Sequence, residues 1–302
     1  MKKYKLSIIV LSYNTKELLR GCLVSLEKNQ GEVDFEVIVP DNGSVDGSVE
    51  MVERDFPNVR LIVSEINLGF AGGNNLAKEL ARGEYVLFLN SDTIVHQKTL
   101  RATVKYLDEN KNVGAVTCKI VLPNGEFDKD TRRSFITPWI GLVHLFLRLD
   151  RLFPKSRLFA KYWYGYIPEN NTHEIDALQG AFFLTRKKIL DKIGWVDEDY
   201  FLDGEDLDLS WRIKELGFKN IYYPEVKITH FKGASKGKIE SQNRKQIPLT
   251  DRFRYRMTGV NSMEIFYRKH LWSRYPFVLN LFVLSGIKVI KAARFIRTIL
   301  LG

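Results

Sequence analysis

Cysteine is nearly absent from the sequence, which contains two such residues among 302, Cys22 and Cys118. They lie far apart and belong to no C-x-x-C or Cys/His pattern. This spacing implies neither a disulfide framework nor a thiolate metal site. We therefore expect both thiols to be reduced, as is usual in the cytoplasm.

Long apolar runs are also absent. Residues 6–11 follow a basic start, but the run is too short for a signal peptide and passes directly into polar residues. Residues 277–287 carry no charge over eleven positions, whereas a transmembrane helix needs about 20 apolar residues. We expect a buried strand at the first run and a helix lying in the plane of a membrane at the second.

Acidic residues are rare in the C-terminal part of the sequence. Residues 252–302 contain ten Lys or Arg residues and one acidic residue, Glu264. This part carries +9 of the formal net charge of +10, so residues 1–251 are close to neutral. Basic residues interleaved with aliphatic ones favour an anionic membrane surface as the partner. A solvated helix face over the core is the alternative. Nucleic acid is not expected, because no DNA- or RNA-binding motif is present.

The first half of the chain alternates strand and helix patterns. Apolar, β-rich runs predict strands at residues 6–12, 35–39, 60–64, 85–89 and 113–118. Between them, the patterns predict helices at residues 15–29, 74–81 and 98–110. This order is typical of a doubly wound, mostly parallel sheet that binds ligands at the carboxyl ends of its strands.

The second half has a less regular pattern. Strands are predicted near Ile175 and Phe182, and a helix over residues 205–216. Residues 135–149 are aromatic and aliphatic with little charge. They predict either a buried helix or a second element that faces the membrane.

Polar segments follow three of the predicted strands, where a pocket is expected. These segments are Asp41-Asn42-Gly43-Ser44, residues 67–75 and Asn90-Ser91-Asp92. The glycines in the second segment fit neither the dinucleotide-binding nor the P-loop pattern. Asp92 could hold a divalent cation on a diphosphate, and Asp41 could accept a hydrogen bond from a nucleotide base or ribose. Each aspartate could also simply form a turn.

Acidic residues are concentrated before and inside the helix predicted at 205–216, namely Asp199, Asp203, Glu205, Asp206 and Asp208. Carboxylates in the first turn of a helix are stabilised by its dipole. Five are more than capping requires, so one is a candidate general base for a hydroxyl group.

In combination, these motifs resemble glycosyltransferase family 2, the inverting nucleotide-sugar transferases of GT-A fold, and within it the bacterial rhamnosyltransferase-like branch. The resemblance covers about residues 5–235. It implies an α/β, Rossmann-like single domain with a central, mostly parallel sheet, followed by a C-terminal amphipathic helical extension. The implied division is 1–240, with a nucleotide-sugar half at about 1–120 and an acceptor half at about 121–240, and a basic tail at 241–302.

The resemblance also implies roles for donor-side residues. Ser12, Asp41 and Asn67 would hold the nucleotide part of the donor. Asp92 would bind Mg²⁺ or Mn²⁺ on the donor diphosphate, and His230 would complete the metal site. Taken alone, His230 has the alternative of an ordinary surface histidine.

On the acceptor side, Asp206 matches the catalytic base of the family. Asp203 and Glu205 are further candidates for contact with the acceptor, because Asp203 stands where relatives often carry an aromatic or small residue. Asn90 replaces the first aspartate of the DxD metal motif, which makes His230 more important as a ligand.

The resemblance implies transfer of a sugar, with rhamnose from dTDP-rhamnose as the leading donor and UDP-sugars as the alternative. The expected acceptor is a saccharide linked to polyprenyl diphosphate, used for cell-surface polysaccharide at the cytoplasmic face of the membrane. Two other functions remain open: a catalytically silent membrane adaptor of the same fold, and a nucleotidyltransferase that releases pyrophosphate.

Overall fold

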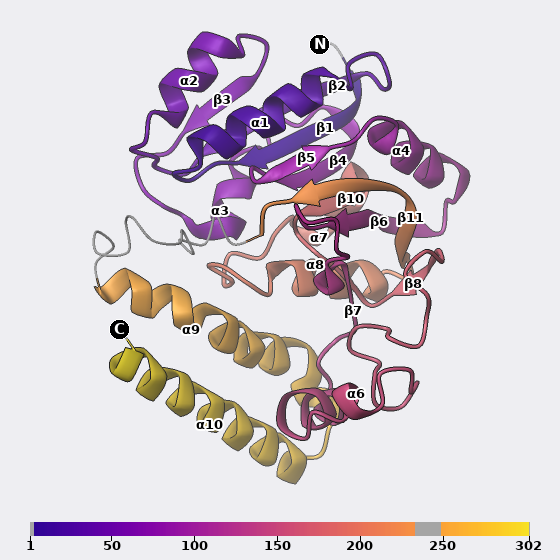
Figure 1. The fold of residues 1–302 in the computed structure, drawn as a ribbon, viewed down its shortest axis with the longest axis vertical. Coiled ribbons are helices and arrows are strands. Elements are labelled where there is room, and N and C mark those ends of the chain that lie inside the picture. Colours follow the sequence, from indigo (N-terminus) through magenta and orange to yellow (C-terminus); the bar gives the residue numbers. More distant parts are fainter. Residues whose placement is uncertain (1–2, 233–248, 302) are drawn as a thin grey trace.

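The computed structural model describes residues 3–232 and 249–301. An α/β body contains the sheet, and two long helices lie beneath it (Figure 1). The predicted domain boundary at residues 240 and 241 lies outside the described residues. Among the described helices, none combines the length and apolar character needed to cross a bilayer.

The body is built on a nine-stranded sheet. Its order is β3 (Arg60–Val63), β2 (Phe35–Asp41), β1 (Tyr4–Leu11), β4 (Gly83–Asn90), β10 (Phe182–Arg186), β6 (Val113–Val121), β11 (Lys219–His230) and β5 (Thr93–Val95), with β8 (His173–Ile175) also paired to β11. Strands β3, β2, β1 and β4 are parallel, as are β6 and β11. The predicted α/β fold with a mostly parallel sheet is confirmed, and β10 runs antiparallel between β4 and β6.

Helices cover both faces of the sheet, and alternate residues of β1 show this directly. Ile8 and Val10 belong to one core with leucines of α1 (Lys16–Glu27) and α4 (Thr99–Glu109), near α2 (Ser48–Asp55). Ile9 belongs to the other core, with residues of α7 (Lys187–Ile193) and α8 (Glu205–Glu215). Because side chains alternate across a strand, burial on both faces requires the continuous apolar run seen in the sequence.

One helix prediction is wrong in position. The helix expected at residues 74–81 is α3 (Gly69–Asn75), which begins five residues earlier and ends before the expected centre. Two asparagine side chains fix its start: Asn67 Oδ1 accepts from the Gly69 N–H at 2.8 Å, and Asn42 Oδ1 from the Leu68 N–H at 2.9 Å. Both satisfy amide groups that a helix start leaves without internal partners.

The predicted helix at 135–149 is broken into short pieces, α5 (Pro138–Gly141), a π-helical turn (Leu142–Phe146) and α6 (Leu149–Leu152). Short strands β7 (Arg132–Arg133) and β9 (Ala177–Leu178) pair beside them. Ile140 and Val143 are buried, whereas Trp139 and Phe146 are about half exposed. The segment thus has one face buried, as the first alternative predicts, and another facing solvent, while contact with a membrane stays a prediction.

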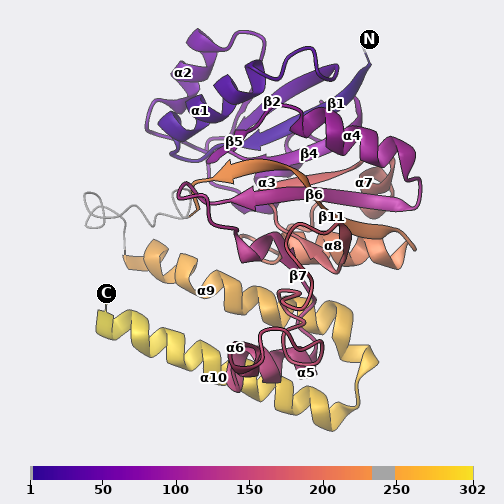
Figure 2. The ribbon, with the colours of Figure 1, turned by 45° about the vertical axis from the view of Figure 1, so that its right-hand side comes forward.

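The predicted C-terminal extension is helical. Helix α9 (Leu249–Phe266) continues through a π-helical turn (Tyr267–Leu271) and a 3₁₀ turn (Trp272–Arg274) to α10 (Phe277–Leu301). Figures 1 and 2 show α9 and α10 side by side below the sheet. A third core joins Phe266 and Ile287 to Trp211 of α8, so the extension packs on the helix that follows the acidic cluster.

Ion pairs also fix the extension to the body. The buried Asp208 accepts from His270 Nε2 at 2.7 Å and from Arg212 Nε at 2.6 Å. Lys269 Nζ lies 2.5 Å from Asp197 and 2.6 Å from Asp199. Two of the five clustered acidic residues, Asp208 and Asp199, therefore pair with basic residues of the extension.

Candidate active site

A cavity of about 530 Å³ lies at the carboxyl ends of β1 and β4, where the sequence predicts a pocket. Leu11 and Asn90, the last residues of these strands, line its sheet side. Residues 203–207 and three residues of α9, Gly259, Ser262 and Met263, line the opposite side. The cavity therefore lies between the sheet and the C-terminal helices.

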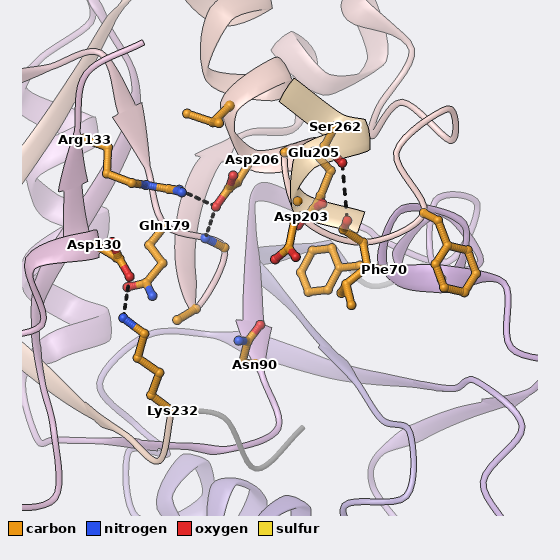
Figure 3. A pocket seen from close by; sticks show the side chains of 18 of the residues that line it. Phe70, Asn90, Asp130, Arg133, Gln179, Asp203, Glu205, Asp206, Lys232 and Ser262 are labelled. Carbon is orange, nitrogen blue, oxygen red and sulfur yellow. Dashed lines mark hydrogen bonds and ion pairs between the residues drawn. The ribbon is translucent and has the colours of Figure 1, made fainter. Parts of the chain in front are cut away.

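Asp206 is held in this cavity by one of its two oxygens (Figure 3). Its Oδ2 atom accepts from Arg133 Nη2 at 2.5 Å and from the Gly180 N–H at 3.0 Å. Its Oδ1 atom is buried and accepts no hydrogen bond from any described residue. The carboxylate is thus fixed in orientation while one oxygen remains for a ligand hydroxyl.

Arg133 is a site residue that the sequence does not indicate. It lies 73 positions from Asp206 and is brought there by pairing of β7 with β9, in which Arg133 faces Ala177. Burial alone would lower the pKa of Arg133, but the nearby Asp206 carboxylate raises it. The two groups therefore form a buried ion pair.

Asp203 and Glu205 line the same cavity. Asp203 has a φ of +66°, a left-handed conformation uncommon for a residue with a side chain. Its Oδ2 atom accepts from the Thr258 hydroxyl of α9 at 3.0 Å. Glu205 opens α8 and is 6% exposed. Asp203 thus links the acidic segment to α9, while Asp206 is held by Arg133 and the Gly180 N–H.

Asp92 and His230 meet at the edge of the cavity. His230 Nε2 lies 3.2 Å from Asp92 Oδ1, and both side chains are buried. His230 lines the cavity, as do Asn90 and Ser91 before Asp92. Asp92 Oδ1 and His230 Nε2 would be the protein atoms that hold a divalent cation here.

No group of three His, Cys, Asp or Glu side chains arranged for a metal occurs in the part of the chain that the structure describes. A pair still fits Mg²⁺ or Mn²⁺ at this kind of site, because Mg²⁺ is usually held by one or two carboxylates together with substrate phosphates and water. The donor set thus fits a cation that arrives with a diphosphate.

A second carboxylate lies on the other side of His230, and the sequence does not indicate it. Asp128 Oδ2 lies 3.8 Å from His230 Nδ1, and Asp128 Oδ1 accepts from Lys232 Nζ at 2.8 Å. Lys232 also pairs with Asp130, as Figure 3 shows. Burial lowers the pKa of His230, but the nearby Asp128 and Asp92 carboxylates outweigh it and raise this pKa to about 9. A divalent cation would therefore displace a proton when it binds Nε2.

Ser12 and Asp41 lie side by side at the ends of β1 and β2, joined by a parallel bridge. Asp41 Oδ1 accepts from the Ser44 N–H at 2.8 Å, so the turn considered from the sequence is present. Asp41 Oδ2 and Ser12 Oγ are buried and have no hydrogen-bond partner among the described residues. Neither residue lines the cavity itself. They form a polar site beside it.

Asn67 lines the cavity, but its side-chain oxygen is used in the fold. It accepts from Asn42 Nδ2 at 2.9 Å as well as from the Gly69 N–H. Gly69 has a φ of +78°, and a Cβ atom there would lie 2.3 Å from the Phe201 carbonyl oxygen. Only glycine fits this close approach. The loop after β3 is thereby fixed against the loop before α8, which connects the two sides of the cavity.

Comparison with known proteins gives the family. The family model for glycosyl transferase family 2 matches residues 7–194. YfnE of Bacillus subtilis, described as an uncharacterized glycosyltransferase, is 38% identical over 112 residues, which are 36% of this chain and 28% of YfnE. The N-acetylglucosaminyl-diphospho-decaprenol L-rhamnosyltransferase of Mycobacterium tuberculosis is 26% identical over 246 residues, 77% of this chain and 78% of that enzyme.

A similar solved structure is the mannosyltransferase PcManGT of Pyrobaculum calidifontis in complex with GDP-Man and Mn²⁺. Its TM-score is 0.56 at 20% sequence identity, over 89% of this chain and 66% of that one. At this identity the likeness concerns the fold. The chain belongs to glycosyltransferase family 2, because the family model covers more than half of it. The predicted family and its GT-A fold are confirmed.

Proposed function

We propose that the chain is an inverting glycosyltransferase that uses a divalent cation and moves a sugar from a nucleotide-diphosphate donor to an acceptor hydroxyl. One observation carries the proposal: His230, which contacts Asp92, and Asp206, with one oxygen available, line the same cavity. A cation ligand and a base in one cavity are what a single displacement at the anomeric carbon requires.

In this proposal Asp206 acts as the general base. Arg133 and the Gly180 N–H hold Oδ2, so Oδ1 receives the proton of the acceptor hydroxyl while that oxygen attacks the anomeric carbon. A cation held by Asp92 and His230 would stabilise negative charge on the leaving diphosphate. Because the acceptor oxygen displaces the nucleotide in one step, the configuration is inverted and no covalent enzyme intermediate forms.

The nucleotide would bind beside the cavity at Ser12 and Asp41, with Asn67 lining the connection. Support comes from the two buried polar atoms, Ser12 Oγ and Asp41 Oδ2, that the described residues leave without partners. Leaving buried polar atoms unpaired costs about 1–3 kcal/mol each. A ribose hydroxyl or base N–H that donates to them would remove this cost, so the site favours a nucleoside.

The donor we propose is dTDP-rhamnose, with UDP-sugars as the alternative, and the acceptor is a saccharide linked to polyprenyl diphosphate. The mycobacterial relative, an N-acetylglucosaminyl-diphospho-decaprenol L-rhamnosyltransferase, supports both. The product would then enter cell-surface polysaccharide.

Nucleotide and cation binding should appear as a thermal shift. We expect UDP or dTDP with Mn²⁺, at 100 times the dissociation constant, to raise the melting temperature by about 5 °C. GDP should do so less. Either nucleotide without Mn²⁺ should give a smaller shift, because the diphosphate then lacks its counter-charge. A shift of equal size with and without Mn²⁺ would contradict the proposed metal dependence.

We also propose that the protein docks on the cytoplasmic face of the membrane. Exposed apolar side chains support this, namely Phe277, Val278 and Phe282 at the start of α10 and Leu152 and Phe153 at α6, all more than half exposed. Lys288 and Arg297 of α10 are exposed as well. Lys269 and Arg274, by contrast, pair with acids of the body, so only part of the basic charge serves such docking.

Docking can be measured by co-sedimentation with vesicles that contain phosphatidylglycerol. Replacing Phe277 and Val278 by serine should lower the vesicle partition constant at least about tenfold, since burying each such side chain contributes roughly 1.5–3 kcal/mol. Val45→Ser is the matched control, because Val45 is 91% exposed and lies in the loop after β2. Equal loss in both variants, or no sedimentation of the wild type, would argue against docking through α10.

A further inference from the structure

An apolar groove of about 350 Å³ lies beside the active-site cavity. One wall is the segment of α5 and its π-helical turn, and the other is α10 with the end of α9. Among the residues that the structure describes, no charged side chain lines the groove. Typical lining residues are Ile136, Leu145, Phe266, Val283 and Ile287. Its walls are thus suited to a hydrocarbon and not to a sugar or nucleotide.

The groove adjoins the cavity. Four residues line both spaces: Ile136, Leu145, Leu207 and Met263. Leu207 directly follows Asp206 in α8, so the apolar surface begins one residue from the candidate base. A molecule lying in the groove therefore reaches the site where the acceptor hydroxyl must stand.

One face of α10 changes from apolar to cationic between the groove and the cavity. Leu279, Val283, Gly286 and Ile290 line the groove, and Arg294, one turn further, lines the polar cavity. The spacing of three or four residues places them on the same side of the helix. From Leu279 to Ile290 the helix extends about 16 Å. This face thus matches an amphiphile with a hydrocarbon chain and an anionic head.

We infer that the groove binds the hydrocarbon chain of the acceptor lipid, while Arg294 faces its phosphate group and the saccharide reaches Asp206. This inference rests on the proposed function, because it assigns a place to the acceptor of that reaction. Continuity with the cavity favours this occupant over a second copy of the chain or a protein partner. Neither of these would need an apolar path that ends beside a catalytic carboxylate.

Two ligands that share a diphosphate head group isolate the contribution of the hydrocarbon chain to binding. Farnesyl diphosphate and methyl diphosphate differ only in hydrocarbon length, and their affinities for the full-length protein can be compared by calorimetry. We expect farnesyl diphosphate to bind at least about tenfold more tightly, since each buried methylene group contributes roughly a factor of four. Equal affinities would overturn the inference.

Gly286→Leu tests whether the hydrocarbon chain binds in this groove. A Cβ atom on Gly286 would lie 3.1 Å from Cζ of Phe146, the end of a half-exposed ring that can move, and leucine favours a helix over glycine. The variant should therefore fold with its groove filled, and the farnesyl preference should fall to about twofold or less. Ser285→Leu is the control, because Ser285 is exposed and lies outside the groove.

Arg294→Gln should weaken both probes by a similar factor, because it removes the charge that faces the shared head. Equal loss of farnesyl preference in Gly286→Leu and Ser285→Leu would overturn the inference. So would a change of oligomeric state in Gly286→Leu with unchanged farnesyl binding, which would identify an interface between copies. A wild type that prefers farnesyl diphosphate but transfers no sugar would contradict the proposed function and leave the groove assignment intact.

Discussion

Asp206→Asn should lower kcat by about 10²–10⁴, the usual contribution of a general base. The asparagine can keep its oxygen toward Arg133 and the Gly180 N–H, which now hold Oδ2, and place its amide where Oδ1 stands. An amide cannot accept the proton of the acceptor hydroxyl. Nucleotide affinity, measured by the thermal shift with Mn²⁺, should stay within about twofold because Ser12 and Asp41 are unchanged.

Comparison variants identify the base among the neighbouring carboxylates. Asp203→Asn and Glu205→Gln should each reduce kcat less than Asp206→Asn, because neither residue shares the Arg133 and Gly180 contacts. Asp191→Asn serves as the control for the general effect of an Asp→Asn change on folding. Asp191 forms an ion pair with Lys187 and does not line the cavity. A larger loss at Asp203 would move the role of base there. Absence of sugar transfer by the wild type, together with an unchanged cellular phenotype in Asp206→Asn, would favour the adaptor hypothesis.

Pyrophosphate release distinguishes the third hypothesis. A nucleotidyltransferase would form pyrophosphate from a nucleoside triphosphate, whereas a glycosyltransferase releases a nucleoside diphosphate. The family model supports the second outcome. The purified protein can be given a nucleoside triphosphate or a nucleotide-sugar, and the released pyrophosphate or nucleoside diphosphate distinguishes the two activities.

The sheet and the position of the cavity could be predicted because they depend on local patterns. Continuous apolar runs identify strands buried on both faces, and the polar tips mark where these strands end. Asn90 and Leu11 lie at the predicted edge. The insertion of β10 between β4 and β6 could not be predicted, since strand order is decided by contacts between segments far apart in the chain.

Site residues divide in the same way. Asp206 and His230 occur in recognisable motifs, and both line the cavity. Arg133 and Asp128 contact them from 73 and 102 positions away, respectively, with no motif of their own. The start of α3 depends on side-chain capping by Asn42 and Asn67, which a periodicity argument does not detect. Long-range contacts therefore account for most of what sequence reasoning missed.

Asp92→Asn should have the second large effect, a loss of about 10³-fold in kcat/KM. A bound cation contributes several kcal/mol of charge stabilisation to the leaving diphosphate, and each 1.36 kcal/mol corresponds to a factor of ten. Asparagine keeps the shape of the buried Asp92 side chain but removes the anionic ligand. The Mn²⁺-dependent part of the thermal shift with UDP or dTDP should disappear in the same variant.

His230→Gln should produce the same loss of Mn²⁺ dependence, since His230 Nε2 and Asp92 Oδ1 lie 3.2 Å apart and would share the ion. His173→Gln is the matched control, because His173 of β8 does not line the cavity. Melting temperatures without ligand establish that each variant is folded. If activity resists EDTA and survives Asp92→Asn but is abolished by Lys232→Met, the charge on the diphosphate is neutralised by Lys232, which also lines the cavity, and no metal is required.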